Sequence, residues 1–213
     1  MGAQMLEPGK VSLLQLEEIF WGGVVEIDSN SKIAVDKAKM VVENVINGTA
    51  AVYGVNTGFG KLASVKIANK DTATLQKNLI LSHSAGVGDE IDRDIVRLIM
   101  ALKVISLARG ASGVRWELIT LLNDMINIDM LPVIPSQGSV GASGDLAPLA
   151  HMALSLIGEG EVRYQGRLMK SQDAFDKSDL NPIILGPKEG LALINGTQVS
   201  TAFALAGLFK TWR

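Results

Sequence analysis

The sequence predicts a mainly α-helical protein with one small β-hairpin. Three observations support this fold class. Apolar residues recur three and four positions apart through most of the chain, glycine and proline punctuate the segments between these stretches, and one short segment alternates in period two around a glycine. Apolar residues make up 47% of the 213 residues, which is enough for a sizeable core, and the length suits one domain or one domain with part of another.

The first half of the chain predicts five helices in succession. Ser12 is placed to cap the first, which ends near Phe20. Gly48 and Gly110 mark the ends of the second and fourth helices, and Pro132 follows the fifth. In the second helix, helical spacing links Ile33, Lys37, Met40, Val41 and Val45. The four later helices cover residues 32–46, 71–84, 92–108 and 114–128.

The second half predicts two further helices and the hairpin. A helix begins just after Gly144 and reaches Ile157, with Pro148 tolerated in its first turn. Alternation around Gly166 predicts a peripheral hairpin over 161–170. The loops expected to carry unusual residues are 53–60, 85–90, 135–144 and 186–196.

The last predicted helix, over 201–212, is apolar around much of its circumference. A helix of this kind needs neighbours on several sides. We therefore expect residues 1–200 to form an amino-terminal domain and residues 201–213 to begin a helical bundle that is truncated here.

Composition argues against several classes of partner. Charged residues make up 20% of the chain, the formal net charge is −2 and no basic stripe is present, so we expect no nucleic-acid partner. The absence of cysteine excludes disulfides and thiolate metal sites, fits a cytoplasmic location, and with only two histidines predicts no metal centre. The most apolar helical stretch expected, 95–108, contains Arg97 and Lys103 and is too short to span a bilayer, so we expect no membrane partner.

One triplet, Ala142-Ser143-Gly144, can cyclise on its own backbone. The amide nitrogen of Gly144 would attack the carbonyl carbon of Ala142, and loss of water from Ser143 would leave a double bond conjugated to the new ring. The product is a methylidene-imidazolone, an electron-poor group that no ordinary side chain supplies. A side chain at residue 144 would obstruct the attack, and glycine reaches backbone angles that other residues resist. Taken alone, such a glycine-rich cluster is usually only a loop.

The wider context favours the chemical interpretation. Residues 138–151, Gly-Ser-Val-Gly-Ala-Ser-Gly-Asp-Leu-Ala-Pro-Leu-Ala-His, resemble the signature of the aromatic amino acid ammonia-lyases over fourteen consecutive positions. The resemblance implies that this ring is the protein's own prosthetic group, without a metal or nucleotide. It also implies an aspartase/fumarase-like helical amino-terminal domain, missing most of the central helical bundle, and a homotetramer in the full-length enzyme.

The resemblance also assigns residues near the triplet. It implicates Asp145 in helping the ring to form, whereas the plain interpretation is an acid that suits the start of the next helix. His151 is interpreted as structural support.

Two more segments resemble functional parts of the family. Tyr53 begins Tyr-Gly-Val-Asn-Thr-Gly-Phe-Gly, which resembles the loop whose tyrosine transfers a proton as base or acid and whose glycines let it move as a lid. Asn195 lies in Glu-Gly-Leu-Ala-Leu-Ile-Asn-Gly-Thr-Gln, which resembles the segment whose asparagine contacts the prosthetic group and the substrate amine. The plain interpretations are a turn with a packed tyrosine and an Asn-Gly turn.

His83 bears on the substrate. Viewed alone it is a helix-end histidine, but Ser-His-Ser-Ala-Gly over 82–86 resembles the histidine-specific branch of the family. An imidazole here would bind a substrate imidazole and reject an apolar ring. The implied reaction converts L-histidine to urocanate and ammonia, and either the substrate amine or its ring would attack the carbon derived from Ser143.

The sequence leaves two alternatives open. One is a lyase or aminomutase that acts on tyrosine or phenylalanine, and the other is a non-catalytic helical scaffold. We expect the 213-residue chain alone to be inactive, because the resemblance places other site residues beyond it, and we expect its triplet to remain uncyclised.

Overall fold

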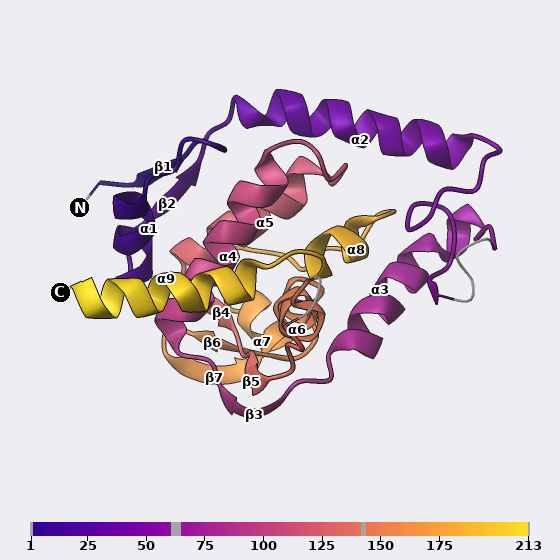
Figure 1. The fold of residues 1–213 in the computed structure, drawn as a ribbon. Helices are drawn as coiled ribbons and strands as arrows, with labels where there is room; N and C mark the ends of the chain where they lie inside the picture. Colours follow the sequence, from indigo (N-terminus) through magenta and orange to yellow (C-terminus); the bar gives the residue numbers. More distant parts are fainter. Residues whose placement is uncertain (1, 61–64, 142–143, 213) are drawn as a thin grey trace.

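Helix α4 lies at the centre of the computed structural model, which describes residues 2–60, 65–141 and 144–212 (Figure 1). The predicted helix is confirmed, but the structure buries almost its whole circumference rather than one face. Neighbours on several sides explain this burial, because a helix that is covered all round can be apolar all round. Helices from both ends of the chain pack directly against it. The elements of this centre are α4 (Arg93–Ala108), α1 (Leu13–Phe20), α5 (Trp116–Asn127) and α9 (Gln198–Trp212).

Arg97 joins three of these segments from inside the core. Its guanidinium donates to the carbonyl oxygens of Gly23 at 2.7 Å, Ile126 at 2.9 Å and Ile19 at 3.3 Å. These carbonyls lie at or just beyond the ends of α1 and α5, where helix carbonyls lack partners within their own helix. One buried side chain therefore satisfies the ends of two helices that pack on α4.

The predicted cap of α1 is confirmed. Ser12 Oγ accepts a hydrogen bond from the backbone nitrogen of Gln15 at 3.3 Å, and the Gln15 side chain accepts one from the backbone nitrogen of Ser12 at 2.9 Å. This reciprocal pair is a capping box. The other predicted helices begin and end within a few residues of their expected limits: α2 (Ser31–Asn47), α3 (Thr72–His83) and α6 (Leu146–Leu156).

Helix α2 leaves exposed most of the apolar residues that helical spacing linked in the sequence. Ile33, Met40 and Val41 are 63%, 59% and 62% exposed, whereas Val35 and Val42 are buried. The helix lies along the edge of the fold (Figure 1) and contacts α4 and α5 with this narrow strip. Helical spacing in the sequence identified a helix correctly, but the packing partner selected which strip became buried.

The sheets are small, and the sequence predicted only part of them. The hairpin over 161–170 is confirmed, but it is not peripheral, because its first strand pairs with a further strand on its other side and Val162 is fully buried. Strands of three or four residues are too short to show a reliable alternation. The pairs are β1 (Gln4–Leu6) parallel to β2 (Val25–Ile27), β3 (Val87–Glu90) antiparallel to β5 (Pro135–Gln137), and the antiparallel sheet β4 (Met130–Pro132), β6 (Glu161–Tyr164), β7 (Arg167–Lys170).

Helix α8 (Glu189–Ile194) lies in a stretch that the sequence predicted as a loop. Its start is stabilised from outside, because the Gln76 side-chain oxygen on α3 accepts hydrogen bonds from Gly190 N at 2.9 Å and Leu191 N at 3.3 Å. Six residues are too few to show helical periodicity. Two other short elements are α7 (Ser171–Phe175) and a 3-10 turn at Asn69–Asp71.

Helix α9 follows α8 and lies along α4 (Figure 1). Its outer side leaves Phe203 44% and Leu208 40% exposed. The stretch Glu189–Thr211, which comprises α8, α9 and the turn between them, is long and apolar enough to cross a membrane by length and composition alone. Within the described residues, the stretch that passes this test is therefore this one and not 95–108, although the same property is common among core helices of water-soluble proteins.

Candidate active site

Gly144, the last residue of the triplet, has a backbone conformation that favours glycine. Its φ of 95° lies in the region that favours glycine. A Cβ at this position would lie 3.4 Å from Asn195 Oδ1 and 3.5 Å from Gly196 N. A side chain at residue 144 would therefore be strained by the backbone conformation and would contact Asn195. Ala142 and Ser143 lie outside the described residues, so ring closure and the expectation that the triplet stays uncyclised both remain predictions.

Asp145 connects the triplet to the start of α9. Its carboxylate accepts hydrogen bonds from Ser139 Oγ at 2.8 Å, Ser200 Oγ at 2.7 Å and Ser200 N at 2.9 Å. Its backbone nitrogen donates to Gly196 O at 2.8 Å. The side chain makes no capping bond to α6, the helix that it precedes. The sequence predicted an acid that suits the start of α6. In the structure, the Asp145 carboxylate instead accepts hydrogen bonds from the first turn of α9, where free N–H groups favour a negative charge.

These hydrogen bonds keep Asp145 ionised. Burial opposes its charge, but the hydrogen bonds from Ser200 and Ser139 outweigh that effect and lower the pKa of Asp145 below its ordinary value of 3.8. A carboxylate with a lowered pKa in the folded state stabilises the fold fully above its unfolded pKa, and this contribution is lost as the pH falls through the folded pKa.

We therefore expect Asp145→Asn to lower the free energy of unfolding by about 2 kcal/mol at neutral pH, because it replaces hydrogen bonds to a charged group. We also expect it to flatten the fall in stability below about pH 4. Urea unfolding at a series of pH values measures both effects. Asp89→Asn, at an exposed position on β3, is the matched control. If the free energy of unfolding of Asp145→Asn falls below pH 4 as steeply as that of the unaltered protein, this role for the carboxylate is contradicted.

Asn195 lies directly after α8 and faces Gly144. The side chain is exposed, while its backbone carbonyl accepts a hydrogen bond from Lys103 Nζ at 2.8 Å. Lys103 also donates to Ala192 O at 3.2 Å. Asn195 and Gly196 line a pocket of about 270 Å³. The structure thus brings together three residues that the sequence singled out, Gly144, Asp145 and Asn195.

The loop that carries Tyr53 packs closely against α8. A Cβ on Gly54, whose φ is 71°, would lie 2.4 Å from Leu191 Cδ2, so glycine permits this close approach. Asn56 is buried, and its side-chain oxygen accepts a hydrogen bond from the backbone at the start of the loop. Tyr53 itself is 55% exposed and packs edge-on against Phe59, with ring centroids 5.8 Å apart. The predicted movement of this loop as a lid stays a prediction.

His83 is the last residue of α3, and its ring has a defined orientation. Nδ1 lies 2.8 Å from Leu79 O and 3.1 Å from Ser82 Oγ. A carbonyl oxygen can only accept, so the bond to Leu79 requires the proton on Nδ1 and leaves Nε2 as an acceptor in the neutral ring. Nε2 makes no hydrogen bond to any residue that the structure describes. His83 can therefore accept a hydrogen bond from a ligand.

His151 connects α6 to the segment that follows His83. Its Nε2 accepts a hydrogen bond from Gly86 N at 3.0 Å. Burial lowers the pKa of His151, which favours the neutral ring that this bond requires. A Cβ on Gly86 would lie 3.1 Å from the same nitrogen, so the approach depends on glycine.

Among the residues predicted from the sequence, Gly144, Asp145 and Asn195 lie together, whereas Tyr53 and His83 lie on neighbouring segments. No contact joins the side chains of Tyr53 or His83 to Gly144 within the described part of the chain, but the elements that carry them pack together: α3 contacts both α6 and α8 (Figure 1). Sequence reasoning missed Lys103 and Ser200, which contact the cluster directly. The available signal for Lys103 was a lysine in an otherwise apolar stretch of helix.

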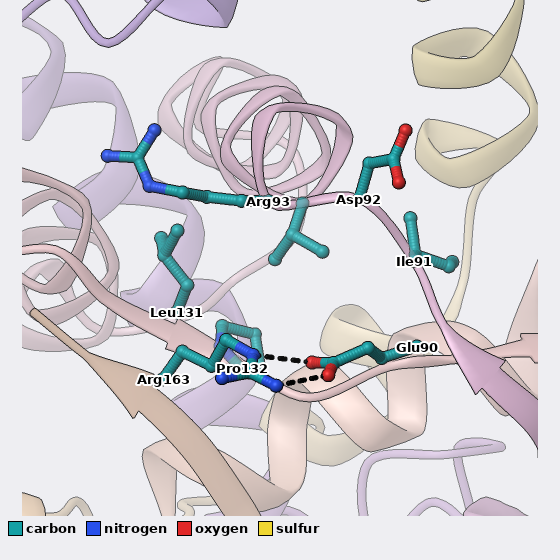
Figure 2. Close-up of a pocket in the computed structure, with 8 residues that line it drawn as sticks. Glu90, Ile91, Asp92, Arg93, Leu131, Pro132 and Arg163 are labelled. Carbon is teal, nitrogen blue, oxygen red and sulfur yellow. Dashed lines mark hydrogen bonds and ion pairs between the residues drawn. The ribbon is translucent and has the colours of Figure 1, made fainter. Parts of the chain in front are cut away.

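A separate pocket of about 230 Å³ lies at the start of α4 (Figure 2). Glu90 on β3 and Arg163 on β6 form a two-point ion pair in its wall, with Arg163 Nε 2.8 Å from Glu90 Oε2. The remaining wall is largely apolar and includes Ile91 and Leu131. None of the residues predicted for the site lines this pocket, and its ion pair connects two sheets.

Comparison with known proteins agrees with this geometry. Residues 11–213 match the family described as aromatic amino acid lyase. Histidine ammonia-lyase from Trypanosoma cruzi is similar over 96% of this chain and 40% of its own, with 34% identity and a TM-score of 0.89. Ergothionase from Treponema denticola is similar over 97% and 42%, with 30% identity and a TM-score of 0.93. Tyrosine aminomutase from Streptomyces globisporus is similar over 96% and 38%, with 33% identity and a TM-score of 0.89.

The chain belongs to the aromatic amino acid lyase family. It has the helical fold of these enzymes and spans about two fifths of the length of the three solved structures.

Proposed function

We propose that this chain is the triplet-bearing part of an ammonia-lyase whose prosthetic group forms from Ala142, Ser143 and Gly144. The observation that carries the proposal is the meeting of Gly144, Asp145 and Asn195 around one turn. The surroundings fit a methylidene-imidazolone, because the positive φ at residue 144 favours the glycine that ring closure needs and the Asn195 amide lies beside it. Tyr53 and His83, on elements packed beside this turn, complete the proposed site within this chain.

The prosthetic group supplies an electrophile when it is present, and the chain's own residues do the rest. Asn195 offers a donor and an acceptor at the triplet for orienting the substrate amine. Tyr53 is proposed to transfer a proton, and its exposed ring leaves it accessible to substrate. Asp145 carries a negative charge beside the triplet and is proposed to help the ring to form.

We propose L-histidine as the substrate, with urocanate and ammonia as products. His83 Nε2 is an unoccupied acceptor, and the substrate imidazole provides an N–H that can donate to it. Phenylalanine provides no such donor and would leave this nitrogen unpaired, which is how a polar site rejects an apolar ring. The full-length enzyme is proposed to be a cytoplasmic homotetramer, and the chain alone to be inactive.

The test is a comparison of kcat/KM for L-histidine, L-tyrosine and L-phenylalanine in the full-length enzyme that carries this sequence. We expect histidine to be preferred. His83→Leu is expected to lower kcat/KM for histidine by about tenfold or more, the cost of one lost hydrogen bond to a buried partner, and to narrow the preference over phenylalanine. A preference for tyrosine or phenylalanine in the unaltered enzyme would contradict the substrate assignment.

Tyrosine is the second candidate substrate. Its phenolic O–H can also donate to His83 Nε2, and a tyrosine aminomutase is among the similar structures. Detection of a β-amino acid product from tyrosine would favour this alternative, because an aminomutase adds the eliminated amine back at the β-carbon.

A further inference from the structure

Lys103 is a buried lysine beneath the proposed site. It lies on α4 and is 1% exposed. Its ammonium donates to two carbonyl oxygens, Asn195 O at 2.8 Å and Ala192 O at 3.2 Å. Within the part of the chain that the structure describes, it forms no ion pair with a carboxylate.

This burial is energetically unfavourable for a lysine. Loss of solvent lowers the pKa of Lys103 to about 7, and the charge of Asp145 acts in the opposite direction to a smaller extent. Apolar residues of similar volume often replace buried charges without loss of stability. A buried lysine that lacks a direct carboxylate partner is therefore typical of a functional site rather than of a structural core.

The two carbonyls that Lys103 contacts belong to the end of α8. Helix carbonyls at this end lack partners within the helix and carry partial negative charge, so a cation is favoured there. The chain turns out of the helix at Asn195, with φ −88° and ψ 135°, and this turn aims the amide oxygen at Gly144. Asp145 N secures the next carbonyl, Gly196 O, at 2.8 Å. The turn is thus fixed from two sides, by Lys103 and by Asp145.

We propose that Lys103 is a positioning residue of the ammonia-lyase reaction, which acts by fixing the Asn195 turn and so directing the Asn195 amide at the triplet. The inference rests on the proposed function. An amide that orients a reacting amine must keep its direction during the reaction, and a displacement of about 1 Å can reduce turnover by about a hundredfold. The ammonium of Lys103 contacts backbone carbonyls at the end of α8, so the proposal routes its effect through the Asn195 turn.

A double-mutant cycle in the full-length enzyme tests this dependence. Lys103→Met is expected to lower kcat by about tenfold or more while KM changes less, and Asn195→Ala lowers kcat on its own. If Lys103 acts through Asn195, then Lys103→Met in the Asn195→Ala background lowers kcat by less than about twofold. An equal loss in both backgrounds, or no loss in the single variant, overturns the proposal.

Additional variants separate folding from positioning. Lys103→Arg retains donors for both carbonyls and is expected to recover part of kcat. Lys103→Gln, which removes the ammonium and is too short for both contacts, takes the place of Lys103→Met in the cycle if the latter does not fold. Lys77→Met removes an exposed lysine on α3 and is expected to leave kcat unchanged within about twofold. Thermal unfolding confirms that each variant is folded, and intact mass shows whether the two water molecules of ring formation have been lost.

The same measurements distinguish failure of the proposed function from failure of the proposed role of Lys103. If the unaltered enzyme turns over none of the three aromatic amino acids and shows no mass deficit, the proposed function fails and this inference fails with it. If the unaltered enzyme is active and Lys103→Met matches it in kcat, only the role of Lys103 is overturned.

Discussion

Replacing Ser143 by alanine in the full-length enzyme is expected to lower turnover by about three orders of magnitude or more. The substitution removes the hydroxyl whose loss creates the conjugated double bond, so the electrophile cannot form. Asp145 and Asn195 remain beside the triplet but have no electrophile to support. Formation of the unsaturated acid from L-histidine, followed by its ultraviolet absorbance, measures the effect.

Intact mass provides an independent readout of the same change. The unaltered enzyme is expected to weigh less than its sequence by two water molecules, and Ser143→Ala is expected to lack this full deficit. Ser136→Ala, on the exposed strand β5, is the matched control and is expected to keep both the deficit and the turnover. An active Ser143→Ala enzyme would contradict the proposed chemistry, whereas an inactive unaltered enzyme without a deficit would favour a helical scaffold.

The second large effect is on stability. Arg97→Met is expected to lower the free energy of unfolding by about 3–5 kcal/mol, because it removes the guanidinium that donates to the carbonyl oxygens of Ile19, Gly23 and Ile126. Urea denaturation followed by circular dichroism measures the change. The slope of the unfolding free energy against urea concentration is expected to be the same in both proteins if only the native state is affected.

Arg93 offers a matched control one helical turn away. Its side chain is 46% exposed, compared with 4% for Arg97, and it pairs with Asp94 and Asp129 at the surface. Exposed ion pairs contribute little, so Arg93→Met is expected to cost less than about 1 kcal/mol. Similar losses in the two variants would show that the buried hydrogen bonds of Arg97 do not carry the effect.

Local signals explain which helices the sequence predicted well. The first helix is predicted by Ser12, and the structure shows that its capping partner, Gln15, lies only three residues away. By contrast, α8 depends on Gln76, which lies 114 residues before Gly190 in the chain. No pattern within the six residues of α8 reveals this contact, and the stretch was therefore predicted as a loop.

The same distinction applies within the site. The sequence placed Asp145 at the start of the helix that follows it, and the structure confirms that α6 begins at the next residue. Its carboxylate instead accepts hydrogen bonds from Ser200, 55 residues later. The negative charge of Asp145 and its place before α6 could be predicted, but its hydrogen-bond partner Ser200 could not.

By itself, the sequence determined which chemistry we propose for this protein, because all atoms of the proposed ring come from three consecutive residues, Ala142, Ser143 and Gly144. It also determined the long helices, whose periodicity and caps are properties of neighbouring positions. Tertiary structure alone decided which side chains surround the turn at Asn195, above all the buried ammonium of Lys103. Such contacts join residues far apart in the chain, and burial, not local pattern, determines whether a polar group must find a partner there.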